Sequence, residues 1–440
     1  MSGLAHALCD RGFTVSGSDR SQSARTDELA AAGVTIHVGH AAQNVAGATV
    51  VVYTTAIAQS NPELVAAREA GAQIVHRAEV LAFMTVGRRS IAITGTHGKS
   101  STTAMIATIF TELERDPSVF VGADSPNIGG NYRLGKGEDV IFEACESDGS
   151  FLRYEGCSEV LLNLEAEHLD QHRNLERLRQ LFQDFVKIAD PQGFLVWCHD
   201  CPELPSVVEH APCRTVSYGL SEGADITARE VVLEPGSISF VPVYRGEVGA
   251  RVTLNVPGAH NVRNALAALG AAVESGIPLD VAGAALGKYA SIGRRFDILG
   301  EVNGRLIVDD YAHHPTEVAA TLAAARAYEG RRIVAVFQPH LYSRTRYFRD
   351  EFARALAAAD VVILNEIYAA REEPIPGVSA ENIAEVIRRD HPGTEATYMP
   401  SQEDIVAHLR ETSRPGDMIL IMGAGDIRHV AEALAASDLS

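Results

Sequence analysis

The chain has 440 residues, enough for two to four domains that each bury a core of their own. Its formal charge of -19 argues against a nucleic-acid backbone or an anionic membrane as the main partner. No apolar run approaches the roughly 20 residues of a membrane span, and the six cysteines are too scattered for a secreted disulfide framework. We therefore expect a cytoplasmic protein that binds neither nucleic acid nor membrane.

Residues 1–87 alternate helix and strand patterns, which is typical of a Rossmann-like parallel unit. We predict helices over 1–12 and 25–32 and strands over 14–18, 34–37 and 49–54. The unit begins inside its first helix, without the strand and Gly-rich turn that usually come before it. Asp19 stands where such folds bind a ribose or a base, and a simple turn aspartate explains it equally well.

The stretch SIAITGTHGKSSTTAMI, residues 90–106, has the layout of a phosphate-binding loop. A short buried strand over 89–94 leads into a Gly-bounded turn, and an amphipathic helix begins at Ser100. Gly95 and Gly98 allow backbone N–H groups to approach phosphate oxygens, and the helix start adds unpaired donors. The loop reads G-x-x-G-K-S, which is two residues shorter than the general phosphate-loop pattern.

Lys99 brings a positive charge to the β- and γ-phosphates of a nucleotide, and Ser100 offers a hydroxyl where such loops ligate Mg²⁺. The predicted nucleotide-binding loop is completed by Thr96, His97 and Ser101. The loop therefore implies a bound nucleotide phosphate together with Mg²⁺.

Carboxylates follow two of the apolar strand patterns in the central region, which we place at residues 88–292, with strands over 140–144, 159–164, 193–198 and 251–256. Glu146 comes after the first of these strands and His168 after the second, at the edge where parallel sheets hold ligands. Each cluster alone is more often a solvated acidic loop, but two in succession after a phosphate loop favour a metal site. Cys198 and Cys201, with Cys213 nearby, fit half a zinc site or a redox pair, but without a second paired cluster their spacing is more often incidental.

A Pro-Gly turn precedes a helix that opens with His260. Asn261 and Asn264 share one face of that helix, where their side-chain amides could bind a purine. Taken by themselves, they are somewhat better explained as residues that cap the N-terminus of the helix. Arg294 and Arg295 then place guanidinium groups at a domain junction, where they suit phosphate or carboxylate.

A third α/β region, residues 293–440, should form a parallel sheet, because helices separate its later strands. We predict strands over 298–303, 305–309, 333–337, 361–364 and 418–422. The motifs DDYAHHP (309–315), QPHLYSRTR (338–346) and GAGD (423–426) each follow such a strand. Basic and histidine side chains gathered at this edge of an acidic protein suggest that it recognises a carboxylate. For each motif alone, a solvated surface segment or a tight turn is an equally good interpretation. The irregular stretch 371–377 marks a loop that could line a cleft.

Taken together, these motifs resemble the Mur ligase family, and within it the subgroup that adds alanine. The resemblance covers almost the whole chain. It is carried by SGSD (16–19), the GTHGKS loop, ESDGSFL (146–152), the N-x-E-x-E-H-L-D run (163–170), G-A-H-N-x-x-N-A (258–265), GRRF, DDYAHHPTE, QPHLYSRTR and GAGD.

The resemblance implies three domains: a UDP-binding Rossmann-like unit (1–87), a central ATPase (88–292), and a C-terminal Rossmann-like unit (293–440) that closes over ATP and the amino acid. It implies that ATP phosphorylates the lactyl carboxylate of UDP-N-acetylmuramate and that the amine of L-alanine attacks the acyl phosphate, a step of peptidoglycan precursor synthesis. Such a reaction needs charge neutralisation and alignment more than a covalent nucleophile. A monomer or a weak homodimer is expected.

The resemblance also implies residue roles. Lys99 holds the phosphates, and Ser100, Glu146 and His168 serve the metal. The nucleotide contacts are Asn261, Asn264, Arg295 and Asp310. Asp19 belongs to the UDP-binding domain, and the candidates for the L-alanine pocket are Tyr311, His313, Arg344 and, with less support, Arg346.

The chain departs from the family pattern in two places. The family usually has a strand and a Gly-rich loop before S-G-L-A, and our hypothesis is that the start was assigned late; upstream in-frame codons without that glycine pattern would count against it. Residues 124–133, near the expected muramoyl site, have an unusual sequence for the family, so we assign no sugar contacts to them. Gln183 stands where many relatives carry a carbamylated lysine, and the alanine-adding subgroup also lacks that lysine.

Three alternatives remain. A recycling ligase that attaches a whole tripeptide to the same acceptor shares most of the motifs. An idle nucleotide-binding scaffold is disfavoured by the intact Lys99, Ser100, Glu146 and His168. A folate-type polyglutamate ligase is disfavoured by the first domain, which carries SGSD.

Overall fold

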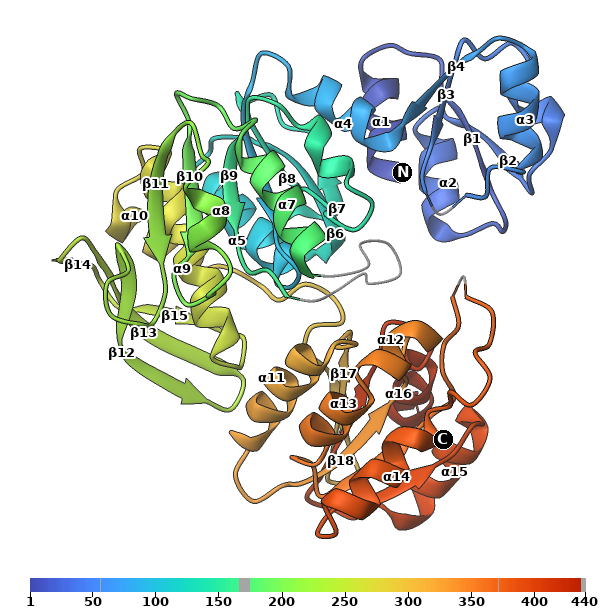
Figure 1. Ribbon diagram of the computed structural model, residues 1–440, viewed down its shortest axis with the longest axis vertical. Coiled ribbons are helices and arrows are strands. Elements are labelled where there is room, and N and C mark those ends of the chain that lie inside the picture. Colours follow the sequence, from blue (N-terminus) through green and yellow to red (C-terminus); the bar gives the residue numbers. More distant parts are fainter. Residues whose placement is uncertain (56, 166–174, 371, 437–440) are drawn as a thin grey trace. The chain divides into compact units, whose positions relative to one another are not determined.

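The computed structural model describes residues 1–55, 57–165, 175–370 and 372–436 (Figure 1). The chain divides into two compact units, Met1–Leu164 with Glu176–Val216, and Glu165–Leu175 with Ser217–Ser440. Strands alternate with helices through both units, as predicted for an α/β protein. All six cysteines carry free thiols. Among the described residues, no helix combines the length and the apolar character needed to cross a membrane.

The N-terminal part of the first unit is built from short elements. They are α1 (Ser2–Asp10), β1 (Ser16–Asp19), α2 (Ala24–Ala31), β2 (Thr35–Val38), η1 (Ala42–Val45), β3 (Val50–Tyr53), α3 (Pro62–Glu69), β4 (Gln73–His76) and α4 (Arg77–Thr85). Strand β1 pairs in parallel with β2, and β3 in parallel with β4, which agrees with the predicted Rossmann-like pattern. The two pairs form separate two-stranded sheets, and most of their residues are exposed or only half-buried. Strand β4 was missed by the prediction.

The central sheet of the first unit carries the phosphate loop. This part of an 11-stranded sheet has the strand order β10-β9-β5-β8-β6-β7, and neighbours pair in parallel except for β7, which is antiparallel to β6. The bounds are β5 (Arg89–Thr94), β6 (Ser118–Ser125), β7 (Gly130–Arg133), β8 (Asp139–Glu143), β9 (Ser158–Leu161) and β10 (Phe194–Cys198). Strands β6 and β7 were not predicted, because glycine and polar residues interrupt their apolar pattern. The other strands lie where the sequence indicated, although β9 ends three residues early.

Helix α5 (Lys99–Glu112) corrects one prediction, because it is not amphipathic. Every residue from Ser101 to Phe110 is buried. The helix packs against β5, β6 and β8, and also contacts η2 (Pro126–Ile128). A helix enclosed in this way needs no polar face. The phosphate loop is therefore anchored by a helix that lies inside the core.

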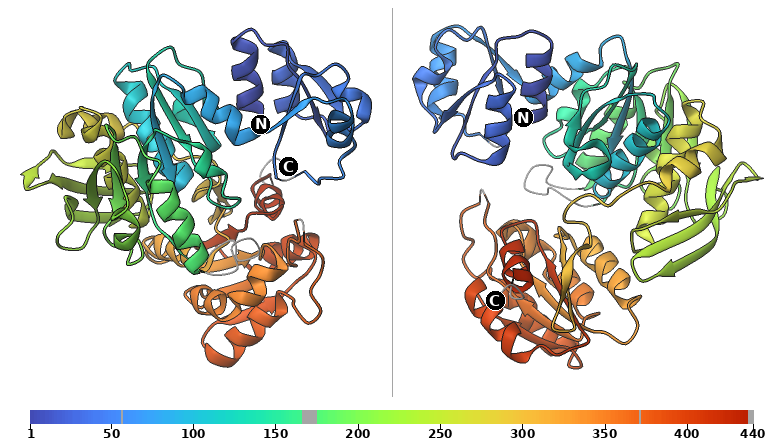
Figure 2. Two further views of the ribbon diagram at one scale, coloured as in Figure 1. Left: turned by 45° about the horizontal axis from the view of Figure 1, so that its top comes forward. Right: turned by 180° about the vertical axis from the view of Figure 1, so that it is seen from behind.

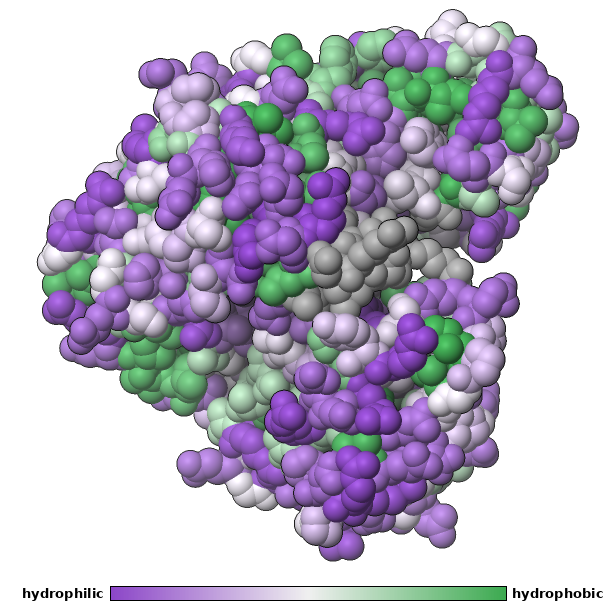
Figure 3. Space-filling view, in the orientation of Figure 1, coloured by the Kyte–Doolittle hydropathy of each residue, from purple (hydrophilic) through white to green (hydrophobic). Residues whose placement is uncertain are grey.

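The remaining helices and strands up to the C-terminal sheet complete the middle of the chain. They are η3 (Ser150–Arg153), α7 (Leu175–Val186), α8 (Pro205–Val208), β11 (Arg214–Tyr218), β12 (Ile226–Glu234), β13 (Ser237–Tyr244), β14 (Glu247–Val248), β15 (Val252–Leu254), α9 (His260–Glu274) and α10 (Leu279–Leu286). Strands β12 and β13 form an antiparallel hairpin that the sequence analysis missed. Exposed Val231, Val232 and Leu233 make part of this hairpin apolar, and Figure 3 shows a hydrophobic patch where Figure 1 draws β12.

The C-terminal sheet has the order β16-β17-β21-β18-β19-β20. Its strands are β16 (Asp297–Val302), β17 (Arg305–Asp310), β18 (Arg332–Phe337), β19 (Val361–Leu364), β20 (Glu395–Tyr398) and β21 (Asp417–Met422). All neighbours pair in parallel, as predicted from the helices between the later strands, except β16, which is antiparallel to β17. Asn303 and Gly304, with φ values of 51° and 75°, form the tight turn that reverses the chain there.

Helices cover both faces of the C-terminal sheet (Figure 2). One face packs on α11 (Pro315–Arg326), α13 (Arg349–Leu356) and α14 (Glu381–Asp390), and the other packs on α15 (Gln402–Thr412) and α16 (Arg428–Ala435). Alternate residues of each strand supply the two cores, as expected for a sheet buried on both sides. The last residues of β17, β21 and β18 pair in register, so the loops that follow these strands meet at one edge.

Candidate functional site

The loop of residues 95–98 joins β5 to α5 at the carboxyl edge of the central sheet. Gly95 has a φ of 143°, and a Cβ added there would lie 2.9 Å from the Cβ of Leu162. Gly98 has a φ of 82° and is the N-cap of α5. Both conformations favour glycine strongly, so the two glycines of the predicted phosphate loop are needed for its shape. The loop leads directly into the N-terminus of a 14-residue helix, as phosphate binding requires.

Asn163 holds the loop from the neighbouring strand connection, a role that the sequence analysis did not assign. The Asn163 Oδ1 atom accepts the His97 N–H at 2.7 Å, and its amide donates to the His97 carbonyl at 3.1 Å. The Thr96 N–H is bonded to the Asn163 carbonyl oxygen at 3.2 Å. The signal was present, because Asn163 is a polar residue near the end of the predicted strand over 159–164.

Lys99 lies at the mouth of this loop and pairs with Glu146. The Lys99 Nζ atom is 3.0 Å from Glu146 Oε2, and it donates to the carbonyl oxygens of Gly95 and Thr96. The Glu146 side chain is only 1% exposed. Burial by itself would lower the pKa of Lys99, but the carboxylate of Glu146 outweighs it and raises the pKa above the ordinary lysine value. Lys99 is therefore a permanent cation beside the loop.

The other loop residues are placed as predicted. Ser100 is half-buried and Ser101 is buried, and both belong to the first turn of α5. His168, the second predicted metal residue, lies outside the described residues. Asp19, at the end of β1, is exposed, and its carboxylate accepts the Ser21 N–H at 3.4 Å. This local turn leaves both readings of Asp19 open.

The segment of residues 124–133, whose sugar contacts the sequence left open, lines a cleft of about 580 Å³ in the first unit. Residues of α1 and α2 form the other side of this cleft, Arg25 among them. Arg25 is paired with Asp124 across it at 2.9 Å.

Asn261 and Asn264 lie on one face of α9, as predicted, and they bind each other. The Asn264 amide donates to Asn261 Oδ1 at 3.2 Å, and the Asn261 amide donates to the Pro257 carbonyl at 2.8 Å. The Nδ1 atom of His260, at the start of the helix, is completely buried. Burial, helped by Arg295, lowers the pKa of His260 to about 4.

Arg295, Tyr311 and His313 are brought together around Glu317, a residue that the sequence analysis quoted without a role. The Arg295 guanidinium lies over the Tyr311 ring, 5.3 Å from its centroid, and 3.7 Å from Glu317 Oε1. The Glu317 carboxylate accepts the His313 N–H at 3.0 Å. The rings of Tyr311 and His313 meet edge to face at 5.2 Å. This cluster stands at the N-terminus of α11.

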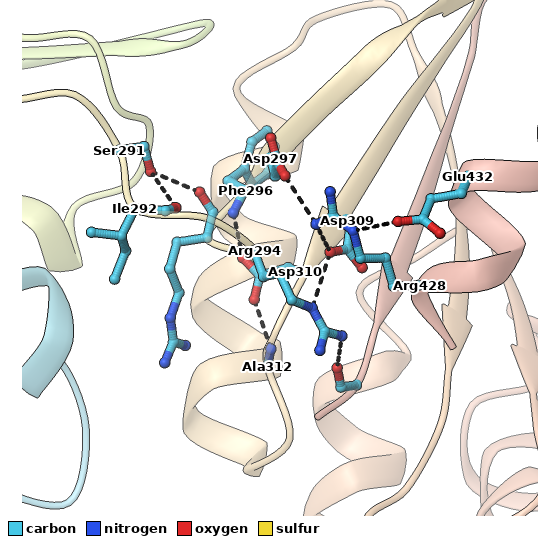
Figure 4. Close-up of polar contacts among 12 residues, drawn as sticks. Ser291, Ile292, Arg294, Phe296, Asp297, Asp309, Asp310, Ala312, Arg428 and Glu432 are labelled. Carbon is cyan, nitrogen blue, oxygen red and sulfur yellow. Dashed lines mark hydrogen bonds and ion pairs between the residues drawn. The ribbon is translucent and has the colours of Figure 1, made fainter. Parts of the chain in front are cut away.

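Asp310 fixes the chain where the central region meets the C-terminal sheet (Figure 4). One carboxylate oxygen accepts the Phe296 N–H at 2.8 Å and the other accepts the Ala312 N–H at 2.7 Å. Burial raises the pKa of Asp310 to about 6, although Arg295 and the two N–H groups favour its charged form. Beside it, buried Asp309 pairs with Arg294 at 3.2 Å and with Arg428 at 2.8 Å.

Arg344 is buried in α12 (Tyr342–Tyr347), and its Nη1 atom donates to Nδ1 of His340 at 3.1 Å. The His340 ring lies 5.9 Å from the His313 ring. The structure therefore brings Tyr311, His313 and Arg344 to one side of the C-terminal sheet, with His340 between them. His340 was missed as a site residue, although it follows the strand pattern at 333–337. Arg346 is exposed.

Sequence comparison gives this chain near full-length relatives. It matches the descriptions "Mur ligase family, catalytic domain" over residues 1–89, "Mur ligase middle domain" over 93–272 and "Mur ligase, glutamate ligase domain" over 294–425. It is 42% identical to the UDP-N-acetylmuramate–L-alanine ligase of Geobacter sulfurreducens, over 99% of this chain and 95% of that protein. Further relatives of the same name are 40–43% identical.

Solved structures agree with this result. The UDP-N-acetylmuramate–alanine ligase of Thermotoga maritima superposes with a TM-score of 0.83 at 28% identity, over 99% of this chain and 95% of that one. A murein peptide ligase from Psychrobacter arcticus reaches a TM-score of 0.71 at 24% identity, over 99% and 96% of the two chains. At that identity the second likeness concerns the fold alone.

Proposed function

Because this chain belongs to the Mur ligase family, we propose that it uses ATP to join L-alanine to the lactyl carboxylate of UDP-N-acetylmuramate, in peptidoglycan precursor synthesis. The observation that carries the choice of substrates is the 42% identity to an alanine-adding ligase over 99% of the chain. The phosphate loop, with Lys99 and Glu146 held 3.0 Å apart, supports the ATP-dependent step.

In the proposed reaction, a lactyl carboxylate oxygen attacks the γ-phosphorus of ATP and ADP leaves. The amine of L-alanine then attacks the acyl carbon, and inorganic phosphate leaves as the amide forms. The nucleophile and the phosphate both carry negative charge, so the first step depends on cations that neutralise their repulsion. Lys99 is suited to this, since its raised pKa keeps it charged at any physiological pH.

Mg²⁺ fits the residues present. Glu146 offers a nearly fully buried carboxylate and Ser100 a hydroxyl at the start of α5, and hard oxygen ligands are those that Mg²⁺ prefers. We propose that these two residues, with His168, hold the metal, whose charge would stabilise the phosphate oxygens.

The nucleotide and amino-acid contacts are also proposals. Asn261, Asn264, Arg295 and Asp310 are assigned to ATP. Tyr311, His313 and Arg344 are assigned to L-alanine, because a guanidinium suits the carboxylate of a small amino acid and Arg344 is hydrogen-bonded to His340, whose ring lies beside that of His313. Arg346 is a weaker candidate, since its side chain is exposed.

A ligase that attaches a tripeptide to the same acceptor is the second candidate, because such a ligase shares most of the sequence motifs. The higher TM-score to the alanine ligase, 0.83 against 0.71, supports L-alanine. The domain limits, the cytoplasmic location and the monomeric or weakly dimeric state stay predictions.

The test is phosphate release by the purified chain with ATP, Mg²⁺ and UDP-N-acetylmuramate, with L-alanine or the tripeptide offered separately. We expect turnover with L-alanine. Lys99→Ala should lower kcat at least 100-fold, because one preorganised charge is worth about 3–4 kcal/mol in a transition state. Lys187→Ala is the matched control, since that lysine lies exposed immediately after α7 and pairs with Asp184, three residues earlier. Turnover with the tripeptide alone would select the second candidate.

A further inference from the structure

The irregular loop after β19 is fastened to α12 by Glu372. The Ser343 N–H donates to Glu372 Oε2 at 2.9 Å, and the Ser343 hydroxyl donates to Glu372 Oε1. Each oxygen of the carboxylate thus accepts one hydrogen bond from the same serine. Glu372 lies in the stretch that the sequence marks as irregular, 371–377, to which neither the fold nor the proposed chemistry has given a role.

A second set of contacts joins the same two loops closer to the sheet. The Leu341 N–H donates to the Tyr368 carbonyl at 3.0 Å, and the Tyr368 N–H donates to the Pro339 carbonyl at 2.8 Å. The rings of His340 and Tyr368 are stacked, 5.7 Å apart with planes at 16°. The loop after β18 is therefore held against the loop after β19 at two places, by Tyr368 and by Glu372.

Helix α12 depends on these external contacts because it is short and begins in a strained conformation. It has six residues, and a helix of that length has little stability of its own. Leu341, immediately before it, has a φ of 69°, which is costly for a residue with a side chain. Arg344 lies in the first turn, one residue after Ser343, and hydrogen-bonds His340.

We propose that Glu372 is a positioning residue for the amino-acid substrate. By holding Ser343, it fixes the first turn of α12 and with it the guanidinium of Arg344, which the proposed function assigns to the carboxylate of L-alanine. The planar guanidinium binds a carboxylate through two parallel hydrogen bonds, so its orientation decides affinity. The inference rests on the proposed function and adds Glu372, which does not itself touch the substrate.

The first test compares Glu372→Ala with Glu373→Ala. Glu373 is the next residue and is exposed, so its replacement makes the same change in charge without the contact. In Glu372→Ala we expect the KM for L-alanine to rise at least tenfold, with kcat lowered less than threefold and the KM for ATP unchanged. Glu373→Ala should match the wild type. Glu372→Gln should fall between them, since its amide oxygen can accept only one of the two hydrogen bonds.

A double-mutant cycle tests whether Glu372 acts through Ser343. Ser343→Ala removes the hydroxyl and keeps the N–H, so it should raise the KM for L-alanine less than Glu372→Ala does. In Glu372→Ala/Ser343→Ala the KM should equal that of Glu372→Ala alone, because the serine contact is already lost. Additive effects would overturn the inference.

Hydrogen exchange at the Ser343 amide gives a readout that needs no activity. The exchange should be faster in Glu372→Ala than in Glu373→Ala, with unchanged rates in β18 and β21. A parallel rise of the KM for all three substrates, or equal KM values in the two alanine variants, would overturn the positioning role. Wild-type protein without L-alanine-dependent turnover would instead overturn the proposed function, and the exchange rates would still decide whether Glu372 holds α12.

Discussion

Glu159 is an acidic residue in an environment that does not suit a charge. It lies in the middle of β9, where it is paired with Ala92 of β5 and Leu195 of β10. Its side chain is fully buried, and neither carboxylate oxygen has a hydrogen-bond partner among the described residues. Burial raises the pKa of Glu159 well above the ordinary value of 4.5, which favours its protonated form in the folded protein.

We predict that Glu159→Leu stabilises the protein. Removing an unpaired buried polar group should raise the free energy of unfolding by about 1–3 kcal/mol. The gain should grow as the pH rises above 4.5, because the unfolded wild type then ionises Glu159 while the folded state keeps it neutral. Urea unfolding at pH 5 and pH 8 measures this through the fluorescence of Trp197, the single tryptophan, on neighbouring β10.

Glu159→Gln separates the two causes. Its amide cannot ionise, so the pH-dependent part of the difference from the wild type should appear as in Glu159→Leu, while the cost of a buried polar group remains. A leucine variant that is less stable than the wild type at pH 8 would contradict the prediction.

At the scale of elements, the functional side chains come from the connections that follow parallel strands. The phosphate loop follows β5, Glu146 follows β8 and Asn163 follows β9, while Tyr311 and His340 follow β17 and β18. The strands fix where these connections start, and glycine or strained residues decide how sharply they turn. Gly95 and Leu341 are the two clearest cases.

We predict that Gly95→Ala lowers kcat/KM for ATP at least 100-fold, because the added methyl group would displace Leu162 or the loop itself by a substantial part of an ångström. Gly300→Ala in β16 is the matched control. Its φ of 150° is close to the 143° of Gly95, but nothing lies within 4 Å of an added Cβ. Steady-state phosphate release should be the same for Gly300→Ala as for the wild type. Equal losses in the two variants would assign the effect to backbone strain alone.

At the scale of the whole molecule, burial is distributed unevenly. The six-stranded C-terminal sheet is enclosed by helices on both faces, and β21 is buried throughout. The strands β1, β2, β3 and β4 form two pairs, whose residues are mostly exposed or half-buried. Isolated two-stranded sheets have little stability of their own.

We therefore predict that native-state hydrogen exchange is fastest, among the sheets, in β1 to β4 and slowest in β18 and β21. We expect the protection factors of the C-terminal strands to exceed those of β1 to β4 by at least 100-fold. The reason is that local opening of the N-terminal pairs exposes far less apolar surface than opening of the C-terminal sheet. Mass spectrometry of peptic fragments from the wild type measures both regions in one sample. Equal protection would show that the N-terminal pairs are stabilised by contacts other than their own hydrogen bonds.

The sequence supports many of these features, for identifiable reasons. Five of the six C-terminal strands were placed within one residue because their apolar runs are flanked by polar turns, whereas β20, with the sequence EATY, was not predicted because it has no apolar run. The hairpin of β12 and β13 was missed, because polar residues and a proline interrupt its apolar pattern. Lys99 and Glu146 were predicted from a motif whose residues are neighbours in sequence or follow adjacent strands. The partners Asn163, Glu317 and His340 were not, because their roles depend on distances between connections.

The amino-acid sequence alone determined the α/β class, the phosphate loop and the family resemblance, since each of these is encoded in local patterns of apolar residues, glycine and charge. Only the tertiary structure decided that α5 is buried on all sides and that β16 runs antiparallel to β17. It also decided that both carboxylate oxygens of Asp310 accept hydrogen bonds from backbone N–H groups. It also brought Glu372 to Ser343, 29 residues earlier in the chain. Such contacts follow from which strands lie side by side, and strand order is a property of the folded sheet rather than of any one segment.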